Sequence, residues 1–216
     1  MKYLKIWHDP QHGGENKGSE YFGLIERIWN VEMVLEIMFR LENFSCVQET
    51  ARRDDRTIYY HDRAENAKAW GANIAFLHHV NAMVYPDGHE LGGQPWPKFD
   101  GLMTFYLSQS QISREVATMI GRSAPVELLQ KKPTYAANPY DWTSNAYNCL
   151  ISYEKIGIPT VLIEWGFSTS PIDREFLTSE FHRPSLIGTM ACGYGRAIEL
   201  LRGNHHDHQN KICPAD

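Results

Sequence analysis

The stretch Thr160–Phe167, with the sequence TVLIEWGF, decides the fold of this 216-residue chain. Its first four residues form an apolar run, which is typical of a strand buried on both faces of a parallel sheet. The carboxylate of Glu164 follows that run. A second stretch, Ile74–Leu77, is equally apolar and leads directly into His78 and His79. Together the two stretches predict a parallel sheet with polar side chains at the carboxyl ends of its strands.

Strands and helices are expected to alternate along the rest of the chain. Further strands are predicted at Tyr3–Trp7, Cys46–Thr50 and Met103–Leu107. In Leu24–Leu41 the apolar residues recur at three- and four-residue steps, which indicates an amphipathic helix. The other helices are predicted at Asp62–Trp70, Ser110–Leu129 and Pro184–Leu201. This order predicts an α/β fold: a single domain with a mostly parallel twisted sheet flanked by helices on both faces.

Composition excludes several classes of protein. The chain has 21 basic and 26 acidic residues, a net charge of −5, so it lacks the basic excess of a general nucleic-acid binder. No apolar run approaches the roughly 18 residues of a membrane span. The apolar part of the N-terminus is too short for a secretory signal, so we expect synthesis in the cytoplasm. Four scattered cysteines form no C-x-x-C pair, which disfavours a sulfur-ligated zinc site, and we expect them to be thiols.

Two irregular stretches and the C-terminus lie outside this regular pattern. Residues 83–100 are rich in proline and glycine, and residues 133–148 are turn-rich and aromatic. Long loops in compact domains tend to be functional, and the aromatic one either lines a binding groove or covers the edge of the sheet. We expect the domain to span residues 1–203. Residues 204–216 are expected to form a flexible, polar, His-rich tail.

Three of the predicted strands end in polar side chains. Asp9–Gly14 includes His12, the third strand continues into His78 and His79, and Glu164 follows the late strand. Carboxyl ends of parallel strands meet at one edge of a sheet, where ligands bind. A buried carboxylate costs several kcal/mol unless it is compensated, so Glu164 calls for a cation, a metal or a chemical role nearby. The scattered His/Glu/His set fits a three-ligand catalytic zinc site with one open position.

Five segments, in order, resemble the type-3 family of N-acetylmuramoyl-L-alanine amidases. These zinc-dependent enzymes cut peptide stems from the glycan strands of peptidoglycan. The segments are Asp9–Gly14, Glu26–Asn30, Thr50–Arg63, Leu77–Ala82 and Glu164–Phe167. The resemblance extends from Lys5 to about Leu201.

The resemblance implies a complete set of site residues. His12, Glu26 and His79 correspond to the zinc ligands, and Glu164 corresponds to the catalytic carboxylate. The His-x-Asn spacing selects His79 over His78, and alternation along a strand points these two rings to opposite faces. Without the resemblance, Glu26 would be only a carboxylate favourably placed at a helix N-terminus.

This chain departs from the family pattern at three positions. Gln11 stands where the family has glycine, Leu77 where it usually has serine, and Ser170 where it usually has asparagine. None of the three replaces an implied ligand, so the expected metal site is unchanged.

The implied activity is zinc-dependent hydrolysis of the amide bond between N-acetylmuramic acid and L-alanine. The substrate would be peptidoglycan or a soluble muropeptide, the cofactor one Zn²⁺ ion, and Glu164 the group that takes the proton of the attacking water. Action on the cell wall would follow release or export, as for a phage or prophage endolysin or a host autolysin. The oligomeric state stays open.

Two alternative functions remain. The same ligand set suits a zinc carboxypeptidase or endopeptidase that acts on the stem peptides. A non-catalytic wall-binding module is a weaker alternative, because all four key residues are present.

Overall fold

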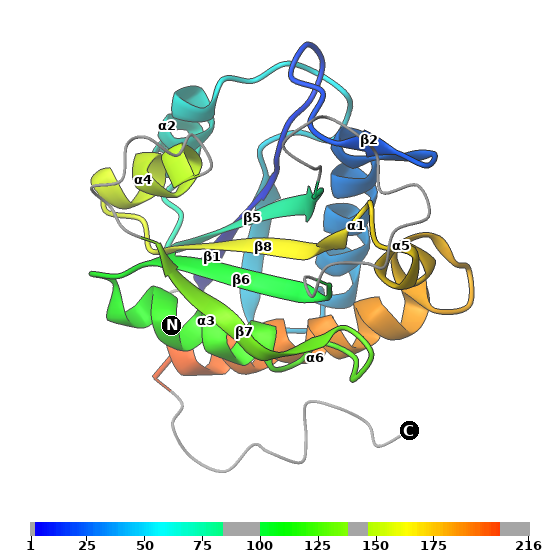
Figure 1. Ribbon diagram of the computed structural model, residues 1–216. Coiled ribbons are helices and arrows are strands. Elements are labelled where there is room, and N and C mark those ends of the chain that lie inside the picture. The colour runs from blue at the N-terminus through cyan, green and yellow to red at the C-terminus, as the bar shows by residue number, and fades with distance from the viewer. Residues whose placement is uncertain (1–2, 84–99, 138–146, 204–216) are drawn as a thin grey trace.

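A six-stranded sheet lies at the centre of the molecule in the computed structural model, which describes residues 3–83, 100–137 and 147–203 (Figure 1). The strand order is β4-β1-β5-β8-β6-β7. The strands are β1 (Leu4–Pro10), β4 (Cys46–Thr50), β5 (Ile74–Asn81), β6 (Leu102–Leu107), β7 (Leu129–Ala137) and β8 (Thr160–Phe167). All neighbours pair in parallel except β6 and β8, which are antiparallel. The predicted mostly parallel sheet is therefore confirmed.

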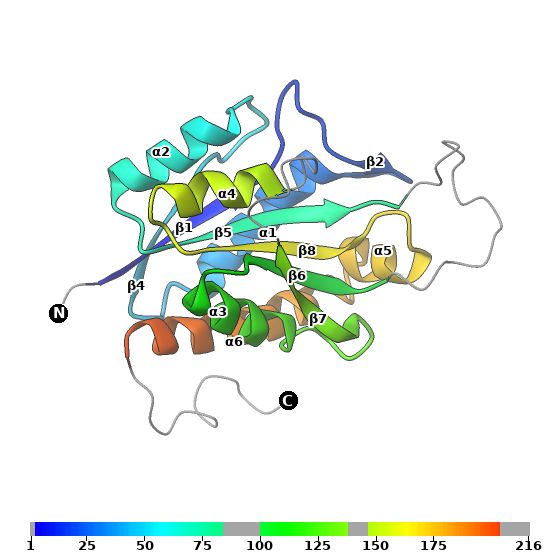
Figure 2. The same ribbon diagram turned by 60° about the vertical axis from the view of Figure 1, so that its left-hand side comes forward.

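Helices cover both faces of the sheet (Figure 2). The helices are α1 (Glu26–Arg40), α2 (Tyr60–Trp70), α3 (Gln111–Gly121), α4 (Asn148–Lys155), α5 (Pro171–Thr178) and α6 (Arg183–Leu201). One hydrophobic cluster joins the sheet to α1, α3 and α6, and a second joins its other face to α2 and α4. Among the described residues, no helix is both long enough and apolar enough to cross a membrane.

The apolar run Ile74–Leu77 explains why β5 occupies a central place. All four side chains are fully buried. Ile74 and Phe76 belong to the first cluster, whereas Ala75 and Leu77 belong to the second, as expected from the alternation of side chains along a strand. Burial on both faces fixes this strand between the helix layers, so its carboxyl end meets those of β1 and β8 at one edge.

Several boundaries differ from the predictions. The predicted helix Ser110–Leu129 ends at Gly121, because proline at position 125 cannot continue a helix, and residues 129–137 form β7 instead. A short hairpin of β2 (Glu20–Tyr21) and β3 (Leu24–Ile25) precedes α1, so the first helix begins at Glu26.

The predictions for the loops, the tail and the cysteines have mixed outcomes. The tail 204–216 and most of the stretch 83–100 lie outside the described residues, as do residues 138–146 of the aromatic stretch. The expectation of four thiols is wrong for Cys192, which is disulfide-bonded. Helices α4 and α5 were not predicted.

A chain of buried polar side chains crosses four adjacent strands. The indole Nε1–H of Trp165 on β8 donates to His78 Nδ1 on β5 (3.2 Å), and His78 Nε2 lies 3.2 Å from His8 Nδ1 on β1. His8 Nε2 lies 3.2 Å from the Oε1 atom of Gln48 on β4. Indole can only donate, so each link of the chain has one direction: His78 donates from Nε2 to His8, and His8 donates from Nε2 to Gln48. Both rings are therefore neutral, with their hydrogen-bonding atoms satisfied.

Candidate active site

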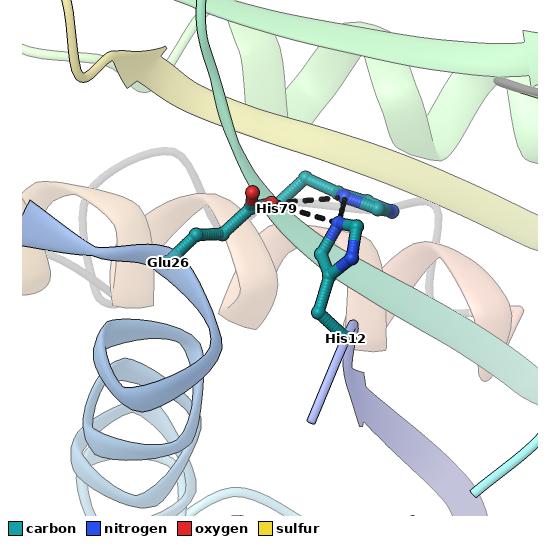
Figure 3. A group of neighbouring side chains, drawn as sticks. All are labelled: His12, Glu26 and His79. Carbon is teal, nitrogen blue, oxygen red and sulfur yellow. Dashed lines mark hydrogen bonds and ion pairs between the residues drawn. The ribbon is translucent and has the colours of Figure 1, made fainter. Parts of the chain in front are cut away.

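Three side chains converge at the carboxyl edge of the sheet (Figure 3). His12 comes from the loop after β1, Glu26 is the first residue of α1, and His79 lies near the end of β5. His12 Nε2 is 3.2 Å from both Glu26 Oε1 and His79 Nδ1, and His79 Nδ1 is 3.1 Å from Glu26 Oε1. The structure thus brings together the three residues that were expected to bind the metal.

Backbone and side-chain hydrogen bonds hold two of these groups in place. The buried Glu26 carboxylate accepts from Val80 N at Oε1 (2.9 Å) and from Ser19 N at Oε2 (2.7 Å). His12 Nδ1 lies 2.9 Å from Asn16 Oδ1, which can only accept, so Nδ1 carries the ring proton. The lone pair of a neutral His12 then lies on Nε2, the atom that faces Glu26 and His79. Orientation of a metal-binding imidazole by a second polar partner is a general feature of such centres.

The electrostatics of the cluster reflect burial and mutual contact. Burial acts to raise the pKa of Glu26, but the two imidazoles override it and hold that pKa well below its usual range. Burial acts to lower the pKa of His12, yet hydrogen bonding and the charge of Glu26 leave it raised. For His79, burial dominates and lowers the pKa, although Glu26 opposes the shift. Glu26 is therefore ionised, and its Oε1 atom contacts both imidazole rings.

The donor triangle fits a tetrahedral metal ion. Zinc with bonds of about 2.0–2.1 Å to nitrogen and oxygen places its ligand atoms about 3.3 Å apart in a tetrahedron. The three edges measured here, 3.1–3.2 Å, are close to that spacing. Two imidazole nitrogens and one carboxylate oxygen suit zinc chemically and leave a fourth position for water or substrate. The residues present therefore fit a catalytic zinc ion.

The backbone of His12 has an unfavourable conformation, and hydrogen bonds from two arginines hold the loop around it. Its φ of 61° lies in the left-handed region, which is uncommon for a residue with a side chain. Arg52 donates from Nε to Pro10 O (2.8 Å) and from Nη2 to Gln11 O (2.8 Å). Arg63 donates to Pro10 O (2.9 Å) and to His12 O. Two buried guanidinium groups therefore fix the carbonyls of the loop that carries His12.

Asp9 balances the charge of Arg63 beneath this loop. Both side chains are buried and form an ion pair. The other carboxylate oxygen of Asp9 accepts from the Tyr153 hydroxyl (2.7 Å) and from the Gln11 amide. Gln11 is thus accommodated without a left-handed backbone, although the related family has glycine there.

Glu164 stands beside His79 on the neighbouring strand. The two residues are register partners between β5 and β8, so their side chains point to the same face. Among the described residues, neither Glu164 Oε2 nor His79 Nε2 has a hydrogen-bond partner, although both atoms are buried. Burial and, second, the charge of Glu26 raise the pKa of Glu164 well above its usual value. A buried carboxyl group with an uncommitted oxygen therefore lies next to the cluster.

Sequence reasoning missed several residues that shape the site. Asn16 and Ser19 lie in a polar loop without a distinctive pattern, and Arg52 looked like any charged residue of a loop. For the aromatic stretch, the two described rings at its ends, Tyr135 and Tyr147, pack on Phe105 at centroid distances of 5.4 and 5.7 Å. Tyr135 belongs to β7 and is the cross-strand neighbour of Phe105. Tyr140 and Trp142 lie outside the described residues, so both interpretations of the aromatic stretch stay predictions.

The chain is similar in sequence to two proteins of Bacillus subtilis. YqiI, an uncharacterized protein of Bacillus subtilis (strain 168), is 27% identical over 190 residues, which cover 87% of this chain and 82% of that protein. The sporulation-specific N-acetylmuramoyl-L-alanine amidase of the same organism is 31% identical over 94 residues, 39% of this chain and 37% of that enzyme.

Solved structures show the same architecture. The crystal structure of an N-acetylmuramoyl-L-alanine amidase from Clostridium difficile 630 superposes with a TM-score of 0.72 at 20% identity. The match covers 94% of this chain and 99% of that one. The sequence family Amidase_3, described as N-acetylmuramoyl-L-alanine amidase, matches residues 6–193. Because that match includes most of the chain, the chain belongs to the N-acetylmuramoyl-L-alanine amidase family.

Proposed function

We propose that this amidase cleaves the bond between N-acetylmuramic acid and L-alanine with a zinc ion held by His12, Glu26 and His79. The observation that carries the proposal is the triangle of two imidazole nitrogens and one carboxylate oxygen, which lie 3.1–3.2 Å apart, close to the spacing of ligands around a tetrahedral zinc ion. Without a cation, hydrogen bonds between the two imidazoles and the buried carboxylate oxygen must hold these three polar atoms together. A divalent cation satisfies all three at once.

The chemistry divides between the ion and the chain. When bound, zinc supplies Lewis-acid activation of water and of the scissile carbonyl oxygen. Glu26 would lower the net charge of a zinc-bound centre to +1, and Asn16 keeps the proton of a neutral His12 on Nδ1, which leaves Nε2 free to bind the ion. The buried loop arginines hold His12 where its lone pair faces the other ligands. This preorganisation lets the protein bind the metal without rebuilding the loop.

Glu164 is assigned the proton transfers. Its Oε2 atom would accept a proton from the attacking water and return it to the nitrogen of the leaving L-alanine. Support comes from its place beside His79 and from the absence of a competing hydrogen-bond partner for that oxygen among the described residues. A base that is already paired with another side chain would first have to break that bond.

Digestion of purified peptidoglycan tests the function. Zinc-loaded protein, with and without chelator, is incubated with cell walls, and the products are read by mass spectrometry. The expected products are free stem peptides that begin with L-alanine, lost with chelator and restored by added zinc. Release of D-alanine, or cleavage within the stem, would favour the zinc peptidase instead. Activity that persists at full rate after complete removal of metal would contradict the assignment of zinc.

A further inference from the structure

A pocket of about 290 Å³ opens beside His12. Two segments form it: the loop that carries His12 and the residues that lead into α2. The walls used in the argument are His12, Glu15, Asn16, Ile58, Tyr59 and Tyr60. Since a proposed metal ligand is one of these walls, any group in the pocket lies next to the reaction centre.

The pocket offers aromatic surface. Two consecutive large rings are exposed beside the candidate active site, Tyr59 by 67% and Tyr60 by 54%. Tyrosine combines an apolar ring with a hydroxyl, which makes it effective at binding amphipathic ligands. Tyr59 precedes α2 and makes no side-chain capping hydrogen bond, so neither the start of that helix nor its stability depends on the phenol.

The charges of the pocket favour a neutral ligand. The guanidinium of Arg63 also lies at the wall, but it is committed to Asp9 and to the carbonyls of Pro10, His12 and Ile58. The charge left exposed among the lining residues is the carboxylate of Glu15. The first turn of α2 carries its own acid, Asp62, which offsets the positive end of the helix. The pocket therefore presents ring faces and hydrogen-bond acceptors to its ligand.

The substrate has two chemically different halves. On one side of the scissile amide lies the glycan, whose sugar rings are uncharged and carry many hydroxyl donors. On the other side lies the stem peptide, which carries carboxylates that Glu15 would repel. We propose that the pocket binds a neutral sugar ring of the glycan strand, with Tyr59 and Tyr60 against the ring and Glu15 accepting from its hydroxyls. The proposal rests on the proposed function for its substrate class.

The first test measures binding without hydrolysis. An uncharged tetrasaccharide of N-acetylglucosamine is titrated calorimetrically into wild type, into a Tyr59→Ala/Tyr60→Ala double variant and into Tyr3→Ala. Tyr3 is a matched control, because it is also 67% exposed and precedes β1, at the opposite end of that strand from His12. We expect the double variant to lose roughly tenfold or more in affinity and Tyr3→Ala to bind like wild type. No binding to wild type, or equal binding to the double variant, would overturn the proposal.

The second test separates the two halves of the substrate. Hydrolysis of a disaccharide-bearing stem peptide is compared with that of a lactoyl stem peptide without sugar. The double variant should lose roughly tenfold in kcat/KM on the first substrate, mainly through KM, and little on the second, with unchanged zinc content. Equal losses on both, or a loss that depends on stem length, would assign the pocket to the peptide. Failure of wild type to hydrolyse either substrate while it binds the tetrasaccharide would count against the proposed function and not against the pocket.

Discussion

Two pairs of histidines lie between β1, with the loop that follows it, and β5. The two pairs differ in the polar groups that their other contacts reach. His8 and His78 face each other at 3.2 Å inside the sheet, and His12 and His79 face each other at 3.2 Å at its edge. The inner pair forms part of a chain that starts at the Trp165 donor and ends at the Gln48 acceptor. The outer pair converges on a single carboxylate oxygen of Glu26.

The contrast shows that the proximity of two imidazoles does not by itself indicate a metal site. In the inner pair every proton has one donor and one acceptor, so the network is complete and electrically neutral. In the outer pair, two imidazole nitrogens and the Oε1 atom of Glu26 lie 3.1–3.2 Å from one another. A metal ion would contact all three atoms at once, and their spacing suits zinc.

Removal of one ring from each pair should have opposite effects. His79→Ala is expected to lose bound zinc and essentially all hydrolytic activity, because one of three protein ligands is gone. His8→Ala should keep zinc while its free energy of unfolding falls by about 2–4 kcal/mol, from the cavity and the unpaired His78 donor. Zinc content by mass spectrometry and urea unfolding measure the two effects. Full zinc occupancy in His79→Ala would remove that residue from the ligand set.

Glu164→Gln should separate metal binding from chemistry. The amide preserves the shape of the side chain but cannot take a proton, so we expect hydrolysis to fall by roughly 100-fold or more. Zinc content and the free energy of unfolding should stay near those of wild type. Peptidoglycan cleavage at the wild-type rate would show that another group acts as the base.

A fall in pH should lower the free energy of unfolding while His8 is still neutral in the folded protein. Burial lowers the pKa of His8 from 6.5 to about 4. The unfolded chain therefore takes up a proton first as the pH falls, and the contribution of neutral His8 is complete above about pH 6.5 and lost between there and pH 4. This corresponds to about 3 kcal/mol. Urea unfolding in chelator, which removes any effect of zinc release, should show a smaller pH dependence in His8→Ala. Equal dependence in both proteins would contradict a neutral buried ring.

Removal of the side-chain amide that contacts each pair should give the smallest difference between the two pairs. Asn16 accepts from His12, and Gln48 accepts from His8. Asn16→Ala should weaken zinc binding by about 10–100-fold, as the loss of a ring-orienting partner does in other zinc centres. Gln48→Ala should lower the free energy of unfolding by about 1–3 kcal/mol and leave zinc affinity unchanged. A chelator-competition titration of both variants decides between these effects, and equal zinc affinities would mean that Asn16 does not orient His12.

Much of the frame could be predicted from the sequence, for identifiable reasons. The runs Ile74–Leu77 and Thr160–Ile163 are apolar enough to be central strands, and the rule that parallel strands end at one edge placed His12, His79 and Glu164 together. Glu26 could be assigned only through the family resemblance, because a carboxylate at a helix start is common. Strand β7 was missed, since its sequence has no clear alternation and follows a helix that stops at Gly121.

The difference between the two histidine pairs could not be predicted in the same way. The sequence shows His78 next to His79 and suggests that they face opposite ways, which the structure confirms. Whether a ring completes a hydrogen-bond chain depends on the register between β1 and β5 and on the residues that β4 and β8 supply. These are relations between distant segments, and hydrophobic periodicity contains no information about them.

The three proposed ligands come from segments far apart in the chain, and this has a consequence for resistance to unfolding. An ion bound by all three would connect the loop after β1, the start of α1 and the end of β5. Local opening of any of these segments would then require a ligand bond to break, so the metal acts as a cross-link as well as a reagent. A zinc-loaded chain should accordingly survive proteases longer than the same chain after chelation.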